Sequence, residues 1–181
     1  MLTRVKLPRM TLYALGDIEP SIDSDAFIHP DCTIIGNVLI AAGATIWPQA
    51  VLRGDQSRIV IGARTSVQDG AVIHCTRELE TTIGQDCVVG HLAHLEGCIV
   101  EDGALVGTGS IVLHRAIVRT GGLVGAGALV PGGMEVPAGA MALGIPAKLR
   151  AGAVTEDQIT HPASEYVRNW ERYRRELRRI D

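Results

Sequence analysis

The feature that most constrains this chain is a six-residue spacing of aliphatic residues, which continues through most of its 181 residues. Two insertions, at residues 58–60 and 79–82, interrupt the count without ending it. Up to residue 95 the hexads begin at Ile28, Ile34, Ile40, Ile46, Leu52, Ile61, Val67, Ile73, Ile83, Val89 and Leu95. Neither a helical period of 3.6 nor plain strand alternation reproduces this spacing. Short strands that turn a corner every six residues do, and three such sides make a coil of about 18 residues.

The sequence therefore predicts an all-β solenoid of about six coils, a parallel β-helix. Only 3% of the residues are aromatic, so the core must consist of small aliphatic contacts, which suits thin stacked layers. Beyond residue 100 the frame predicts an exchange of sizes. First positions shrink to Gly107 and Gly125, whereas fifth positions, small at Ala44, grow to Leu105 and Ile111. If both positions point inward, each layer keeps a constant volume.

Composition excludes several classes of protein. The formal net charge of -3 argues against a nucleic-acid partner, which requires clustered basic residues. No apolar stretch is long enough for a membrane span, and the N-terminus lacks the apolar region of a signal peptide. The four cysteines have no metal-binding spacing and are expected to be reduced, so we expect a cytoplasmic protein.

The chain is expected to form a single domain over residues 1–181, with the β-helix at about 15–145. The C-terminal segment has a different period. Apolar residues at steps of three and four predict an amphipathic α-helix over about 160–180, packed on the β-helix. This stripe consists of Ala163, Tyr166, Val167, Trp170, Tyr173, Leu177 and Ile180. Its basic opposite face is expected to be solvated.

Polar side chains gather on one face of the predicted β-helix. Residues three hexads apart stack on the same face, separated by roughly the 4.8 Å of neighbouring strands. The hexads that begin at Leu52, Ile73, Leu95 and Leu113 form one such stack, and its outward second positions are Arg53, His74, Glu96 and His114. His74 and Glu96 are therefore expected on adjacent coils, close enough to share a metal.

The neighbouring face carries Gln68, Asp69 and His91. Within one chain His91 cannot easily reach His74, but it could reach the equivalent site of a neighbouring chain if three β-helices pack side by side. A ligand from a second chain would complete a set of two histidines and a carboxylate, with an open position for water. The frame places His94 at a turn.

Three segments resemble the γ-class carbonic anhydrases and their hexapeptide-repeat relatives: VLRGDQSRIVIGARTSVQDGAVIH, IGQDCVVGHLAHLEGCIVEDGALVGTGSIV and GIPAK. The resemblance covers roughly residues 15–175. It implies a left-handed β-helix, a homotrimer and zinc, with iron or cobalt as alternatives, at each subunit interface. By the same resemblance His74 and His91 match metal ligands, and Arg53 and Asp55 match an ion pair that bridges subunits. Gln68 and Asp69 match polar residues beside the metal-bound water.

The third metal ligand departs from the family pattern. Where the family usually has LHGC this sequence has LEGC, so Glu96 replaces a histidine. We favour Glu96 as the third ligand, because the stack places it above His74, and His94 is the alternative.

The resemblance implies reversible hydration of CO₂ to bicarbonate, through a metal that lowers the pKa of its bound water. A carboxylate ligand should weaken that activity. Two other functions stay open: an acyltransferase or thioesterase acting on acyl-CoA, with His114 or His94 as general base, and a non-catalytic trimeric scaffold.

Overall fold

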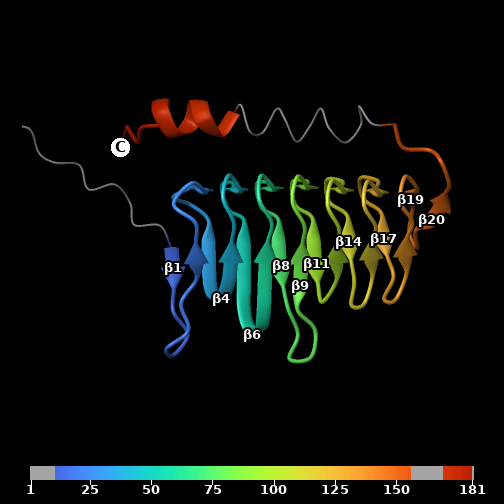
Figure 1. Cartoon of the computed structure of the whole chain (residues 1–181), viewed down its shortest axis with the longest axis horizontal. Helices are drawn as coiled ribbons and strands as arrows, with labels where there is room; N and C mark the ends of the chain where they lie inside the picture. Colours follow the sequence, from blue (N-terminus) through green and yellow to red (C-terminus); the bar gives the residue numbers. More distant parts are fainter. Residues whose placement is uncertain (1–10, 156–168, 181) are drawn as a thin grey trace, which may run out of the picture.

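Three short strands make up each turn of the chain, one on each side of a triangular coil. The computed structural model describes residues 11–155 and 169–180, and they form a left-handed parallel β-helix of about seven turns with a short C-terminal helix (Figure 1). A 12-stranded sheet covers two sides because two long strands continue around a corner, and an eight-stranded sheet covers the third. The predicted fold class is confirmed.

Each side of the coil has its own series of strands. The first side has β1 (Thr11–Tyr13), β8 (Val72–His74), β11 (His94–Glu96), β14 (Ile111–Val112) and β17 (Leu129–Val130). The second has β2 (Ser21–Ile22), β9 (Thr81–Ile83), β12 (Ile99–Val100), β15 (Ile117–Val118) and β18 (Glu135–Val136). Both include the long β4 (Thr33–Ile40) and β6 (Val51–Ile61). The third has β3 (Phe27–Ile28), β5 (Thr45–Ile46), β7 (Ser66–Val67), β10 (Val88–Val89), β13 (Leu105–Val106), β16 (Leu123–Val124), β19 (Met141–Leu143) and β20 (Lys148–Arg150).

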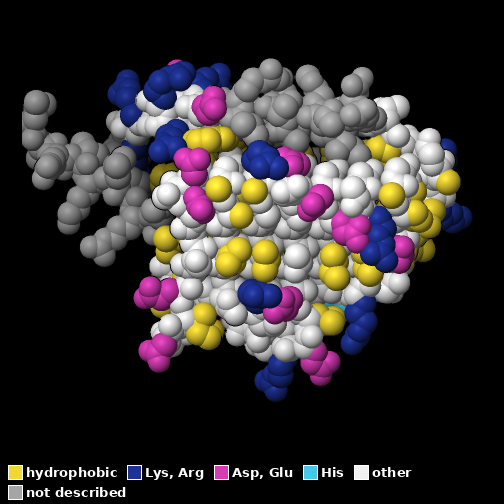
Figure 2. Space-filling model, viewed as in Figure 1, with side chains coloured by type: hydrophobic (Ala, Val, Ile, Leu, Met, Phe, Trp, Pro, Cys, Tyr) yellow, Lys and Arg dark blue, Asp and Glu magenta, His cyan; other side chains and the backbone are white. Residues whose placement is uncertain are grey.

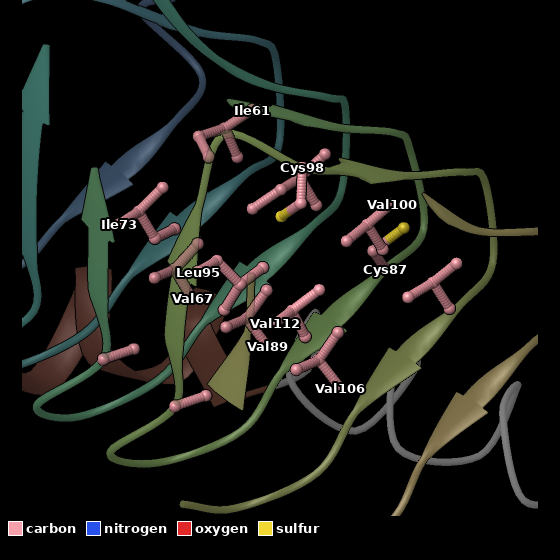
Figure 3. Packing of buried hydrophobic residues seen from close by; sticks show 14 of the residues in the cluster. Ile61, Val67, Ile73, Cys87, Val89, Leu95, Cys98, Val100, Val106 and Val112 are labelled. Atoms are coloured by element: carbon pink, nitrogen blue, oxygen red, sulfur yellow. The ribbon is translucent and has the colours of Figure 1, made fainter. Parts of the chain in front are cut away.

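The core is the column of aliphatic side chains that the three sides direct inward. Figure 3 shows these side chains meeting from neighbouring coils, with Ile73, Leu95 and Val112 stacked on one side. Every predicted first position from Ile34 to Leu95 is buried, as are the small fifth positions. Burial raises the pKa of Cys98, one of four free buried cysteines, to about 12, so this thiol is unreactive.

Beyond residue 95 the predicted frame is wrong by one residue. Leu95 pairs with Val112 rather than Leu113, so this coil has one residue fewer than three hexads. Because side chains alternate between the two faces of a strand, a one-residue shift turns predicted inward side chains such as Leu105 and Ile111 away from the core. The core is therefore continued by Val100, Val106, Val112, Val118, Val124, Val130 and Val136, with small residues such as Ala104 two positions earlier. Ile111 is exposed, and the predicted exchange of sizes does not occur.

A helical segment at residues 169–176 packs on the first coils of the β-helix (Figure 1). The ring of Tyr173 meets that of Trp47 edge-on, with centroids 5.1 Å apart, and Trp170 is also buried. Leu177 and Ile180 are exposed, so the predicted apolar stripe ends earlier than expected, because the chain leaves the helix after residue 176. The stripe residues before 169 lie outside the described residues. Figure 2 shows basic side chains gathered over this segment. Within the described ranges no helix is long and apolar enough to cross a membrane.

Candidate metal site

The predicted polar column exists on the first side of the β-helix. The Cα atom of His74 in β8 pairs with Arg53 of β6 on one side and with Glu96 of β11 on the other. Their neighbours Leu52, Ile73 and Leu95 are fully buried, so the three polar side chains point outward. The strand register therefore brings together three of the four residues that the repeat frame aligned.

His74 contacts a carboxylate through each of its ring nitrogens. Nδ1 lies 2.7 Å from Oε1 of Glu96, and Nε2 lies 2.9 Å from Oδ1 of Asp55. Arg53 donates a hydrogen bond to the other oxygen of Asp55. Desolvation acts to raise the pKa of Asp55, but the hydrogen bonds from His74 and Arg53 outweigh it and hold this pKa below its usual value.

A bulge in β6 places Asp55 beside His74. Gly36 of β4 pairs with Gly54, but Val38 pairs with Ile59, so β6 has extra residues at 55–58. The predicted insertion of residues 58–60 is thus present, slightly earlier in the chain. Sequence reasoning did not give Asp55 a contact with His74, because a period of six says nothing about side-chain direction inside a bulge.

Glu96 is surrounded by imidazoles. Besides His74, it has Nε2 of His94 at 3.7 Å and Nε2 of His114 at 3.4 Å from its Oε2 atom. Desolvation acts to raise the pKa of Glu96, but the hydrogen bond from His74 and the nearby histidine charges lower it below its usual value.

Two histidines near Glu96 do not have the backbone positions that the frame predicted. His94 begins strand β11 and is not at a turn. Val112 is the strand partner of Leu95, so the residue after it, which the frame expected to be His114, is Leu113. His114 lies in the turn that follows. That turn carries the His114 ring back towards Glu96, so the predicted proximity holds for a different reason.

A second carboxylate–imidazole pair lies around the corner, in the turns that follow β7 and β10. Nδ1 of His91 lies 3.0 Å from Oδ2 of Asp69, and both side chains are about half exposed, at 45% and 48%. Gln68, next to Asp69, is buried. The structure thus brings Asp69 and His91 together, on a different side from His74.

Two buried residues that sequence reasoning missed hold the column in place. Thr81 is completely buried, and its hydroxyl donates to the carbonyl of His74 and accepts from the backbone N–H of Gly97 at 2.7 Å. Cys75 accepts a hydrogen bond from the backbone N–H of Ser57 in the bulge, at 3.2 Å. A threonine in an insertion and a cysteine after a strand carry no sequence signal for these contacts.

Within residues 11–155 and 169–180 of one chain, no group of three or more His, Cys, Asp or Glu side chains could hold a metal ion. The corner of the coil separates the His74–Glu96 pair from His91. A site that uses all three residues therefore requires more than one chain.

Comparison with known proteins relates the chain to two kinds of curated protein. Carnitine operon protein CaiE of Escherichia coli O157:H7 is 39% identical over 98 residues, and the mitochondrial gamma carbonic anhydrase 3 of Arabidopsis thaliana is 40% identical over 104 residues. Each match covers 54% of this chain, and 50% and 40% of those relatives. The chain thus spans about half the length of the curated relatives it matches, and the predicted resemblance to γ-class carbonic anhydrases and related proteins is confirmed.

Solved structures match over nearly the whole length. A hexapeptide transferase family protein from Anaplasma phagocytophilum is 37% identical with a TM-score of 0.85, over 91% of this chain and 98% of that one. A candidate acetyltransferase from Bacillus cereus is 35% identical with a TM-score of 0.87, over 90% and 95% of the two chains. The family model described as bacterial transferase hexapeptide (six repeats) matches residues 19–54. With its six-residue frame and its coiled parallel strands, the chain belongs to the hexapeptide-repeat transferase family.

Proposed function

We propose that this chain hydrates CO₂ reversibly, in the manner of the γ-class carbonic anhydrases, at a metal site formed between the chains of a homotrimer. In this proposal His74 and Glu96 of one chain and His91 of the next hold the metal. The activity is lower than that of a three-histidine site because Glu96 replaces one histidine.

The observation that carries the proposal is the pairing of His74 with Glu96. Their Cα atoms are partners in adjacent strands, and their side chains touch at 2.7 Å on an outward-facing surface. Both side chains are partly exposed, at 15% and 23%, so they are accessible to a second chain. Glu96, at the position of the expected histidine, thus already lies beside His74, the other proposed metal ligand of the same chain.

His91 has the environment of a metal-binding histidine. Metal-binding histidines usually give their other ring nitrogen to a carboxylate, which fixes the orientation of the ring. In this chain Asp69 contacts Nδ1 of His91, and this contact leaves Nε2 available to bind the metal. The half-exposed ring can therefore reach outward to a neighbouring chain.

The donor set fits the proposed metal. Two imidazoles and one carboxylate are ligands that zinc accepts, and iron and cobalt share this preference. A metal held there would supply the Lewis acidity that activates water for attack on CO₂. The negative charge of Glu96 reduces that acidity relative to a neutral imidazole. Asp69 would keep the His91 ring in place, and Gln68 would hydrogen-bond substrate at the interface.

Metal analysis of the purified protein tests the proposal. We expect one metal per chain in the wild type and its loss in both His74→Ala and His91→Ala. Because the two histidines belong to different chains at each site, co-assembly of the two variants in equal amounts should restore about a quarter of the sites. A metal-free wild-type trimer would favour the scaffold, and no recovery in mixed trimers would reject the shared site.

A second candidate, acyl transfer, is favoured by the hexapeptide transferase structures and by a cavity of about 350 Å³ lined by Arg115, the residue after His114. Leu79, Ile99 and Ile117 give the cavity apolar walls, and Arg115 adds a cation. His114, whose Nε2 lies 3.4 Å from Oε2 of Glu96, would serve in its neutral form as the general base for an acyl acceptor. Thermal stabilisation by CoA but not by zinc, together with CoA-dependent turnover lost in His114→Ala, would support this reading.

A further inference from the structure

We propose that Asp55 is a positioning residue, which selects the ring nitrogen that His74 offers to the metal. The inference rests on the proposed metal site. The resemblance to carbonic anhydrases suggested a different role for Asp55, as a partner of Arg53 across the subunit interface. In this structure Arg53 and Asp55 pair within one chain, and the second oxygen of Asp55 contacts His74.

The hydrogen bonds of His74 carry the inference. An ionised carboxylate can only accept hydrogen bonds, so the 2.9 Å contact with Asp55 places a hydrogen on Nε2. Nδ1 faces Oε1 of Glu96, 2.7 Å away, and in the metal-free chain a proton on Nδ1 accounts for this contact, because an imidazolium has an N–H on both nitrogens. A metal held by His74 and Glu96 would replace that proton, whereas Asp55 would keep the hydrogen on Nε2.

Asp55 is held firmly enough to impose this choice. Its second oxygen accepts a hydrogen bond from Arg53, the strand partner of His74. The bulge that carries Asp55 is tied through Ser57 to Cys75, the residue directly after His74. Contacts of Arg53 before Asp55 and of Ser57 after it thus fix the bulge next to the strand that carries His74.

The other proposed histidine ligand has a similar arrangement. Asp69 contacts Nδ1 of His91 at 3.0 Å, whereas Asp55 contacts Nε2 of His74. Each imidazole would therefore have one nitrogen held by an aspartate and the other available to bind the metal. Loss of such a supporting carboxylate typically weakens metal binding by about 10- to 100-fold.

Zinc affinity and histidine tautomers test the inference in the assembled full-length protein. In Asp55→Asn, the side-chain amide can donate to Nε2 and move the hydrogen to Nδ1. We therefore expect a zinc Kd about 10- to 100-fold weaker than that of the wild type, measured by chelator competition. The matched control is Asp86→Asn, which removes an exposed partner of Arg64 and should leave the Kd unchanged.

Nitrogen-15 NMR of the metal-free wild type gives a second measurement that does not depend on a variant folding. We expect the neutral form of His74 to carry its hydrogen on Nε2, and a hydrogen on Nδ1 would overturn the inference. If the wild type binds zinc and Asp55→Asn binds it equally well, the inference fails while the metal site stands. If the wild type binds no zinc, the proposed function fails first, and the inference fails with it.

Discussion

Replacement of Thr81 by valine should destabilise the protein more than replacement by serine, although valine matches threonine more closely in shape. The Thr81 hydroxyl is completely buried and bridges the carbonyl of His74 and the N–H of Gly97. In Thr81→Val the Gly97 N–H loses its acceptor, which costs about 2 kcal/mol. The lost bond to the His74 carbonyl costs about 1 kcal/mol more.

The Thr81→Ser variant keeps both hydrogen bonds and loses one buried methyl group, which costs about 1 kcal/mol. The valine variant should therefore be about 2 kcal/mol less stable than the serine variant, a difference of about 4–8 °C in Tm for a chain of this length. Urea and thermal unfolding would measure this, at one fixed protein concentration because assembly adds to apparent stability. A valine variant as stable as the serine variant would refute the bridging role of the hydroxyl.

Three further predictions concern the rest of the chain. Gly97→Ala should lose about 1–2 kcal/mol in urea unfolding, because Gly97 has a φ of +60° and a Cβ there would lie 3.1 Å from the His114 ring. The pKa values of the two glutamates that Arg119 contacts are lowered by its hydrogen bonds, so their stabilisation is present at neutral pH and lost as pH falls through those values. The stability difference between wild type and Arg119→Gln should accordingly shrink in acid titrations. In Tyr173→Ala the ring over Trp47 is lost, and a red shift of tryptophan fluorescence should report its exposure.

The sequence predicts the first coils well because large and small inward positions alternate there without ambiguity. After residue 95 the strands have two adjacent aliphatic residues, as in Leu105–Val106 and Ile111–Val112, so two frames fit the spacing equally well. The choice depends on the corner after Glu96, where the coil is one residue shorter. A corner has no period, and the pattern therefore could not reveal the shift.

Strand register likewise explains how much of the site could be predicted. His74 and Glu96 were aligned correctly because the frame resumes at Ile83 after the insertion at residues 79–82. The contacts of Asp55 and Thr81 depend on side-chain directions in inserted segments, which hydrophobic spacing does not determine. Any third ligand from another chain depends on packing between chains, which the pattern of one chain does not specify.

Three of the departures from the hexad frame meet at His74 and Glu96. The bulge of β6 brings Asp55 to His74, and the second insertion contains Thr81, which hydrogen-bonds to the His74 carbonyl. The shortened corner begins at Gly97, whose N–H bonds to Thr81. A repeat can accommodate an irregularity at any coil, and places where local patterns break are typically functional or strained. Three of them around one outward-facing pair make this pair, rather than the many regular coils, the first place to test the proposed function.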